Sequence, residues 1–256
     1  MTDRSQSPRR RTSPSPQILR AVLRLRELIL TGTLPAGQRV AELKVVDLVG
    51  VSRTPLRLAM ERLEHEGLLA RRPSGGFVVR KFTLQEVQHA IELRGALEGV
   101  ACRFAAEHRD DTGLDALDAT VDELDRILHG QPESSTTFDE YVRLNAQFHE
   151  QLVRVAKTPL LGRLIEQVQG LPFASPSAFV QTQATSAESL RILIVAQEHH
   201  RTIAQAIRAG DGSRAELLAR EHARLALRNL DAAVRDIDAF RRLPGGALVM
   251  LDEGRR

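Results

Sequence analysis

The chain has 256 residues, which is enough for two domains that each bury a core. Its formal net charge of +3 hides a division: residues 1–81 hold 16 Lys and Arg against 7 Asp and Glu, whereas residues 82–256 hold 20 against 26. A single cysteine excludes an intramolecular disulfide framework and suits a reducing cytoplasm, and no apolar run is long enough to span a bilayer.

The first 15 residues are rich in Arg, Ser and Pro and lack an apolar core, so we expect a disordered basic arm and not a secretory signal. The arginines of this arm supply part of the basic excess, and chance is the alternative explanation for the rest. A clear excess remains in the short region up to residue 81. This excess favours a polyanion-binding domain joined to an acidic domain with another task.

Helical spacing of apolar residues predicts helices over residues 17–31, 40–49 and 52–66 in the basic part. Glycines and a proline follow the first of them and stop its pattern. Three short helices close together in sequence are typical of a helix-turn-helix domain.

The stretch from Gly50 to Arg57 is predicted to form the turn and the start of the recognition helix. Gly50 can adopt the left-handed conformation that ends a helix, and Ser52 is a suitable N-cap. Arg53 and Arg57 are four residues apart and therefore share a helix face, beside Thr54. We expect this face of the helix to enter the major groove of DNA.

A β-hairpin is predicted around residues 73–76, with short strands at 68–72 and 77–79. Such a hairpin is the wing of a winged helix. We expect Arg71 and Arg72 to meet phosphates and the backbone at Gly75 and Gly76 to approach a groove.

After residue 82 the strand signals vanish, and a helical bundle is predicted. The expected helices cover residues 83–108, 111–130, 136–156, 158–170, 187–209 and 212–240. Thr83 and Glu86 form a capping box for the first of these helices. The segment 171–177 is rich in Pro and Ser and is expected to form a lid or the edge of a cavity.

These patterns predict a mainly α protein with an N-terminal winged helix-turn-helix and a C-terminal all-α bundle. We expect a disordered arm over residues 1–15, a DNA-binding domain over 16–81, a helical domain over 82–240 and a flexible tail over 241–256.

Five short motifs resemble the DNA-binding domain of GntR-family transcription regulators. They are LRELI at 25–29, GTLPAG at 32–37, VSRTPLR at 51–57, LE at 63–64 and EGLL at 66–69. The second half resembles the FCD ligand-binding domain of the FadR-like branch of that family, and the whole resemblance covers residues 17–240.

The resemblance implies that Arg53, Thr54 and Arg57 contact operator bases and phosphates, with Gly76 in the wing. Members of the family bind palindromic double-stranded operators as homodimers and are usually released by a small metabolite. Many also use a basic residue early in their second helix, where only Lys44 is available here. The recognition helix should therefore carry more of the operator choice than usual.

Histidines in the second half form a candidate metal site. Asn145 and His149 lie at i and i+4 on one helix, His199 and His200 lie on a second helix, and His222 lies on a third. From the residues alone, these imidazoles either bind a divalent transition metal or are ordinary core and surface histidines. The FCD resemblance implies that Asn145, His149, His200 and His222 are the ligands, and it selects His200 over His199.

A neutral amide in place of an anionic ligand leaves more positive charge at such a site. We therefore expect Zn, Ni or Mn together with a small carboxylate effector that completes the coordination. Arg94 is the candidate second anchor for this carboxylate; the alternative is an ion pair with Glu98 at i+4.

Two other functions compete with a metabolite-responsive repressor of a catabolic operon. Three histidines also hold catalytic zinc, but the sequence lacks an arrangement such as His-Glu-x-x-His that would supply an evident general base, and a metalloenzyme leaves the winged helix unexplained. An architectural DNA-binding protein would not need the large helical domain. We therefore expect a regulator in the cytoplasm, not an enzyme and not a membrane protein.

Overall fold

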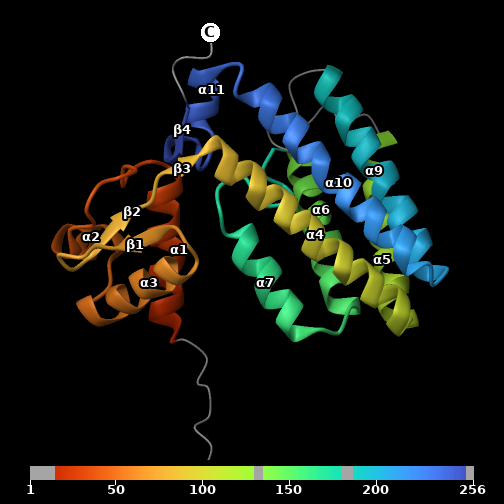
Figure 1. The fold of residues 1–256 in the computed structure, drawn as a ribbon, viewed down its shortest axis with the longest axis horizontal. Coiled ribbons are helices and arrows are strands. Elements are labelled where there is room, and N and C mark those ends of the chain that lie inside the picture. The colour runs from red at the N-terminus through yellow and green to blue at the C-terminus, as the bar shows by residue number, and fades with distance from the viewer. Residues whose placement is uncertain (1–14, 130–134, 180–186, 252–256) are drawn as a thin grey trace, which may run out of the picture.

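The computed structural model describes residues 15–129, 135–179 and 187–251, and it confirms a mainly α protein (Figure 1). The N-terminal module is a winged helix-turn-helix, so the predicted fold is confirmed there. Its elements are α1 (Pro16–Leu30), α2 (Glu42–Val49), α3 (Arg53–His65), β1 (Leu69–Arg71) and β2 (Phe77–Val79). Of the predicted basic arm, only Ser15 belongs to the described residues.

The turn between α2 and α3 forms as the sequence predicts, with one difference. Gly50 ends α2 in the left-handed conformation, at φ 69° and ψ 39°, and its N–H donates to the carbonyl of Val46. Ser52 stands directly before α3, but its side chain makes no capping hydrogen bond, contrary to the expected N-cap. Its backbone carbonyl instead accepts a hydrogen bond from the N–H of Leu56.

The hairpin pairs β1 with β2 in antiparallel register, with Leu69 opposite Val79. Gly75 and Gly76 both have positive φ, at 85° and 78°, in the turn that joins the strands. The loop before α2 adds a bridge to this hairpin at Arg39, so the wing is held against the helical part of the module.

The C-terminal domain is a bundle whose helices follow the predicted ranges to within one or two residues, apart from the last. They are α4 (Leu84–His108), α5 (Asp111–His129), α6 (Ser135–Val155), α7 (Pro159–Gln169), α9 (Ala187–Arg208) and α10 (Gly212–Ala233). The predicted capping box is confirmed, because Thr83 Oγ1 accepts from the N–H of Glu86 and the Glu86 carboxylate accepts from the N–H of Thr83.

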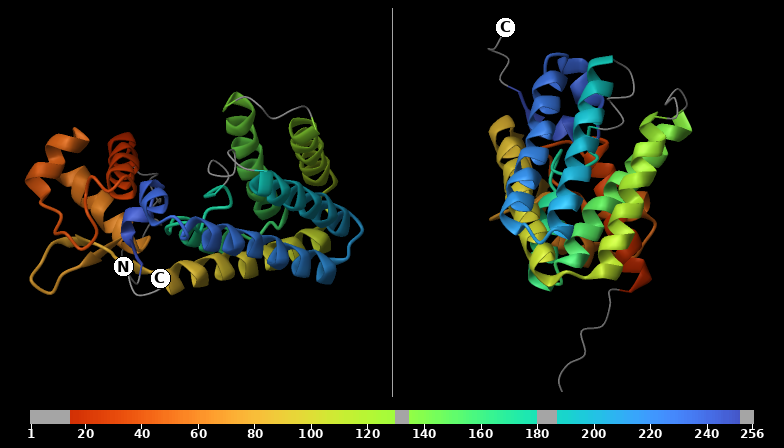
Figure 2. Two further views of the ribbon diagram at one scale, coloured as in Figure 1. Left: turned by 90° about the horizontal axis from the view of Figure 1, so that it is seen from above. Right: turned by 90° about the vertical axis from the view of Figure 1, so that its right-hand side faces the viewer.

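Helices α4 and α10 lie side by side along most of their length (Figures 1 and 2). Gly95 permits this close packing, since a Cβ placed there would lie 2.5 Å from the Cβ of Ala223. The two helices thus form one rigid wall of the bundle, and each carries a predicted site residue, Arg94 on α4 and His222 on α10.

The helix predicted over residues 212–240 is two helices, which corrects the expectation. It ends at Ala233, and α11 (Ile237–Arg242) begins after Asp236. The Asp236 carboxylate accepts a hydrogen bond from the N–H of Ala239, 2.9 Å away, and this cap starts the new helix in a different direction.

The flexible tail predicted over residues 241–256 is wrong for the part that the structure describes. A 3-10 turn η1 (Gly246–Leu248) leads into β4 (Val249–Met250), which pairs in parallel with β3 (Phe82–Thr83) at the junction of the two domains. The physical reason is burial, because Leu248 is 1% exposed and shares one core with Phe240 and the DNA-binding module. Residues 252–256 lie outside the described residues.

The hydrophobic core of the bundle is separate from the core of the N-terminal module and lies between α4, α5, α6, α9 and α10. Within the described residues, no helix combines the length and the apolar character that crossing a bilayer requires.

Candidate functional site

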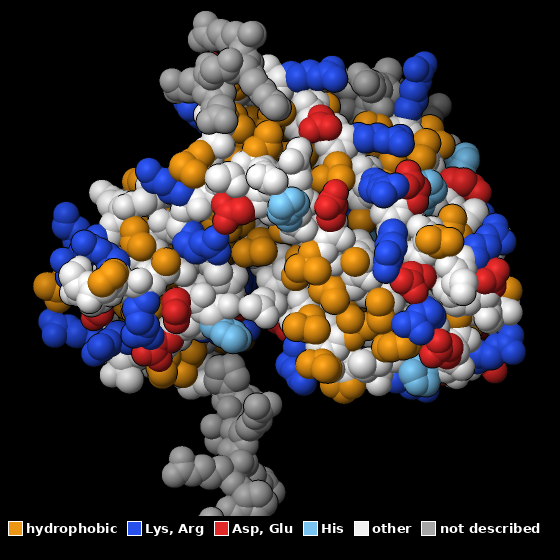
Figure 3. Space-filling view, viewed as in Figure 1, with side chains coloured by type: hydrophobic (Ala, Val, Ile, Leu, Met, Phe, Trp, Pro, Cys, Tyr) orange, Lys and Arg blue, Asp and Glu red, His pale blue; other side chains and the backbone are white. Residues whose placement is uncertain are grey.

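The predicted DNA contacts stand on one exposed surface of the N-terminal module. Arg53, Thr54 and Arg57 are exposed in the first turns of α3, and Lys44 is exposed on α2. Lys and Arg side chains gather over this module in the space-filling view (Figure 3). Glu42 is close to them, with its Oε1 3.9 Å from Nε of Arg57, so an acidic residue lies beside these predicted contacts.

The two arginines predicted in the wing, Arg71 and Arg72, differ in their contacts. Arg71 turns toward α3, with its guanidinium 3.9 Å from Glu61 and 3.8 Å from Glu64, and it covers the ring of Phe77. Arg72 and the two glycines stand at the hairpin turn, where the N–H of Arg72 donates to the carbonyl of Gly76. Arg71 is exposed and Arg72 is half-buried, and the contact of each with DNA stays a prediction.

Arg39 is a basic residue at the wing that sequence reasoning missed. It is exposed, and its guanidinium lies about 4 Å from where a Cβ at Gly76 would stand. It lies in a loop without any periodic pattern, so the only signal in the sequence was its charge.

Three of the predicted ligands meet inside the bundle. His149 of α6, His200 of α9 and His222 of α10 are buried and offer nitrogen atoms that all lie within 4.8 Å of one another. The Nε2 atom of His222 lies 3.2 Å from Nε2 of His200 and 3.4 Å from Nε2 of His149.

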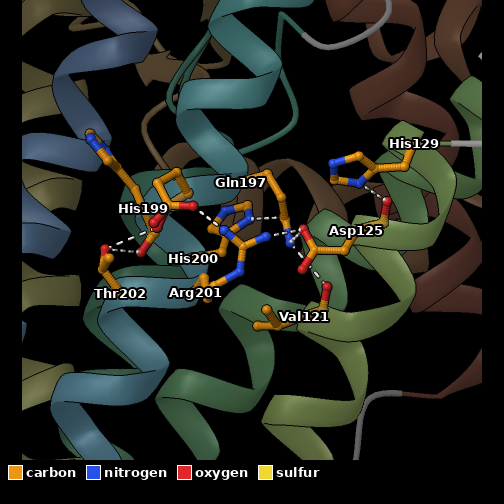
Figure 4. A network of polar contacts seen from close by, with 9 residues as sticks. Val121, Asp125, His129, Gln197, His199, His200, Arg201 and Thr202 are labelled. Carbon is orange, nitrogen blue, oxygen red and sulfur yellow. Dashed lines mark hydrogen bonds and ion pairs between the residues drawn. The ribbon is translucent and has the colours of Figure 1, made fainter.

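A hydrogen-bond chain fixes the tautomer of His200 (Figure 4). The Gln197 amide nitrogen donates to the carbonyl of Val121 and to the Asp125 carboxylate, each 3.0 Å away, and neither group can donate in return. The Gln197 oxygen must therefore face Nδ1 of His200, 3.0 Å away, so Nδ1 carries the proton. Nε2 of His200 is left with a lone pair that points into the cluster.

Glu98 of α4 lies beside His149, a contact that the sequence did not reveal. Its Oε1 lies 3.2 Å from Nδ1 of His149, and both side chains are buried. Burial by itself raises the pKa of Glu98, but its neighbours His149 and Arg94 outweigh it and lower the pKa to about 2. The carboxylate stands on the Nδ1 side of His149, and Nε2 is the nitrogen that lies toward His222.

The cluster fits a divalent transition metal by its donor atoms and by their spacing. Lone pairs that converge repel one another unless a proton or a cation lies between them, and a proton on Nε2 of His222 can reach only one of its two neighbours. In a tetrahedral site with metal–nitrogen bonds of about 2.0–2.1 Å, adjacent nitrogens stand about 3.3 Å apart. The separations of 3.2 and 3.4 Å agree with that value.

Two histidines of this cluster, His200 and His222, are difficult to protonate. Burial and the neighbouring histidines hold the pKa of His200 and the pKa of His222 well below their usual value. Both imidazoles are therefore neutral at physiological pH, which is the form that binds a metal ion.

His199 and Asn145 differ in their relation to the cluster. His199 leaves α9 in another direction from His200 (Figure 4) and contributes no nitrogen to the cluster. Asn145 is buried and donates from Nδ2 to Oγ of Ser177, 2.9 Å away, while Ser177 donates to the carbonyl of Val142. Its Oδ1 is thus the atom available as a ligand.

Arg94 makes the ion pair with Glu98 that was the alternative for it, and its role as an anchor for a carboxylate stays a prediction. It is 2% exposed, and its NH1 lies 3.6 Å from Oε2 of Glu98, which is a loose ion pair. Its Nε and NH1 atoms have no hydrogen-bond partner among the described residues, and it lines a cavity of about 40 Å³ with Asn145 and His222. A buried donor without a partner is costly, so these two atoms are the groups that a bound anion would have to satisfy.

A second and larger cavity, of about 470 Å³, lies between α6 and α7 and reaches His149. Pro176 lines both cavities, so the predicted Pro/Ser-rich segment does form an edge of each. The histidine cluster thus lies between a small cavity at Arg94 and a wider one beside α7.

Comparisons with known proteins agree with this architecture. Residues 17–79 match the model of the bacterial regulatory proteins of the gntR family, and residues 89–225 match the FCD domain. The uncharacterized HTH-type transcriptional regulator YdhC of Bacillus subtilis is 32% identical over 62% of this chain and 69% of its own length. A probable D-xylose utilization operon transcriptional repressor of Paenarthrobacter nicotinovorans is 32% identical over 73% of this chain and 77% of its own length.

Among solved structures, E. coli McbR/YncC is similar in fold. It has a TM-score of 0.60 at 20% sequence identity, and the match covers 84% of this chain and 97% of that one.

Proposed function

Because the chain belongs to the GntR family of bacterial regulatory proteins and carries an FCD domain, we propose that it is a metal-dependent repressor that a small carboxylate releases from its operator. The family and its relatives are transcriptional regulators and not enzymes, so the metalloenzyme alternative is set aside. The observation that carries the proposal is the convergence of three imidazole nitrogens beside the unused donors of Arg94.

The metal would be held by His149, His200 and His222, with Oδ1 of Asn145 as a further ligand. Its positive charge would attract the effector carboxylate, and Arg94 would hold the same group from the other side. Zn, Ni and Mn all suit imidazole and amide ligands, and Asn145 adds no negative charge that would compete with the anion.

Repression of a catabolic operon is supported by the relative described as a D-xylose utilization repressor. The regulator would act in the cytoplasm, where its double-stranded operator lies. An effector weakens DNA binding only if it favours a dimer geometry in which the two α3 helices no longer match their half-sites. We infer that residues 82–84, at the domain junction, transmit this change.

The direct test is elemental analysis of the purified protein without a His-tag, followed by operator binding with and without small carboxylates. We expect about one Zn, Ni or Mn per chain and a carboxylate-dependent release from the operator. Metal-free protein that still responds fully to the same carboxylates would contradict the proposed site.

Arg57→Ala is expected to weaken specific operator binding by about 1–3 kcal/mol, which is roughly 5- to 150-fold, if the guanidinium makes a bidentate base contact. The affinity is measured on a duplex selected from random sequence with the wild-type protein. Arg224→Ala is the matched control, because this arginine of α10 is also exposed. Equal operator affinity for the two variants would refute the role of Arg57.

We propose a homodimer that packs through α4 and α7. Leu93, Leu160 and Leu164 are 51%, 59% and 42% exposed, and hydrophobic side chains gather over these helices on the face nearest the viewer in Figure 3. Exposed apolar side chains gathered on one face mark an association surface.

The double variant Leu160→Glu and Leu164→Glu is therefore expected to be monomeric in light scattering and to lose cooperative operator binding. Its control is Leu217→Glu, on α10, where the leucine is 68% exposed. A dimer that persists in the double variant would place the interface elsewhere.

A further inference from the structure

The segment of residues 171–179, which we call the strap, contacts both the histidine site and the DNA-binding module. Near its end, Oγ of Ser177 accepts a hydrogen bond from Nδ2 of Asn145, the predicted metal ligand on α6. Near its start, Phe173 belongs to the buried core that contains the DNA-binding module, and not to the core of the bundle. Only three residues separate these two contacts along the chain.

The start of the strap lies against the end of α3, the predicted recognition helix. A Cβ at Gly67, the second residue after α3, would lie 3.2 Å from Cδ2 of Leu171. Four residues earlier, on α7, the side-chain amide of Gln167 donates to the carbonyl of His65, the last residue of α3, 3.2 Å away. A movement of the strap therefore meets the recognition helix at its C-terminal end.

The strap also packs against the C-terminal residues that hold α1. The ring of Phe173 stacks on Phe240 of α11, with centroids 4.9 Å apart and planes at 27°. Pro172 packs against Gly245, where an added Cβ would lie 3.3 Å from the proline Cβ. The N–H of Gly245 donates in turn to the carbonyl of Leu30, the last residue of α1. The strap thus reaches a second helix of the DNA-binding module through residues that lie beyond the match to the FCD domain.

The backbone of the strap is strained at its centre of contact. Phe173 has a φ of 60°, in the left-handed region that a bulky side chain rarely adopts. Such a conformation persists only where the surroundings impose it. Here the ring is 4% exposed and is held between Phe240 and Phe179, whose centroid lies 5.3 Å away. A strained segment held by contacts at both ends responds when one of these contacts changes.

We infer that the strap couples the occupant of the histidine site to the DNA-binding module. A metal ion that takes Oδ1 of Asn145 as a ligand fixes this amide, and with it the hydrogen bond from Nδ2 to Ser177. The strap then carries the change to Pro172 and Phe173, and through the C-terminal residues to α1. The inference rests on the proposed metal site, and it adds a route to the one through residues 82–84.

Hydrogen exchange of the full-length protein with and without Zn²⁺ tests the coupling. In wild type, Zn²⁺ should slow exchange within the strap and at the amide of Gly245 by roughly 2- to 10-fold, the range of one hydrogen bond. Ser177→Ala should still bind about one Zn²⁺ per chain but lose the effect at Gly245. Thr202→Ala is the matched control, because this hydroxyl of α9 donates to carbonyls of its own helix, and this variant should keep the effect.

A second variant separates the coupling from damage at the metal site. Phe240→Leu keeps an apolar side chain but removes the ring that stacks on Phe173. Zn²⁺ should still slow exchange near Ser177 in this variant, whereas exchange at Gly245 should no longer respond. The loss at the far end alone would place the aromatic stack between the two contacts.

Two results would overturn the inference. One is an equal response of Gly245 to Zn²⁺ in wild type and in Ser177→Ala, and the other is wild-type protein that binds Zn²⁺ without any change at Gly245. Both of these leave the proposed metal site standing. Wild-type protein that binds no Zn²⁺ would contradict the metal site itself, and the inference with it.

Discussion

His200→Ala is expected to yield protein that binds its operator normally but carries little metal and no longer responds to carboxylates. The lost imidazole is the one whose tautomer Gln197 fixes, so a prepared ligand disappears from the cluster. Loss of an outer-shell partner lowers metal affinity by roughly 10- to 100-fold, and loss of a ligand should exceed that range. Operator affinity should stay within about 2-fold, because the cluster lies in the bundle and not in the module that presents α3.

The neighbouring residue supplies the control for this experiment. His199 precedes His200 on the same helix, but it contributes no nitrogen to the cluster. Metal content by elemental analysis and operator release should therefore be preserved in His199→Ala. Loss of metal in His199→Ala with retention in His200→Ala would reverse the choice between the two histidines, and loss of operator binding in a folded His200→Ala would contradict the division of roles between the domains.

Helix ends and caps that depend on a few consecutive residues could be predicted from the sequence. Gly50 ends α2, and the capping box of Thr83 and Glu86 starts α4, because each depends on the conformation of only a few residues. The pairing of Asn145 with His149 is likewise a matter of helical spacing. The choice of His200 needed more than spacing, and the resemblance to a known domain supplied it.

The side chains that contact the Nδ1 atoms of His149 and His200 could not be predicted, because their own positions depend on other helices. Glu98 reaches His149 from α4, and Gln197 binds α5 through the carbonyl of Val121 and the carboxylate of Asp125. These contacts depend on the angles between helices, and a periodic pattern contains no information about those angles. The same reason explains why Arg71 turned out to face the acidic residues of α3.

The C-terminal strand was missed for a different reason. Two residues are too few to show an alternating pattern, and the glycines before them are typical of a loop. The pairing of β4 with β3 is decided by burial at a junction that only the folded bundle creates. The strand β4 follows α10, α11 and η1 along the chain. This C-terminal segment therefore connects the helix that carries His222 to the edge of the DNA-binding module.

Gly246→Ala should therefore detach this segment and destabilise the junction between the two domains. A Cβ at residue 246 would lie 2.0 Å from the carbonyl oxygen of Phe240 and 2.9 Å from its carbon, and backbone atoms at the end of α11 cannot yield as a flexible side chain does. We expect the free energy of unfolding to fall by about 1–3 kcal/mol, the usual cost of a forced overlap in a packed region. The hydrogen bond from the N–H of Gly245 to the carbonyl of Leu30 should be lost with it.

Hydrogen exchange locates the effect, since amides of β3 and of residues 245–250 should exchange faster in Gly246→Ala while those of α5 and α6 should not. Gly170→Ala is the control: Gly170 has an ordinary helical φ of −70°, and the nearest atom to its added Cβ is 3.4 Å away. Because the segment joins α10 to β3, the Gly246→Ala variant should also need more carboxylate to leave the operator. Unchanged exchange in β3 together with unchanged stability would show that the pairing of β4 with β3 contributes nothing to holding the two domains together.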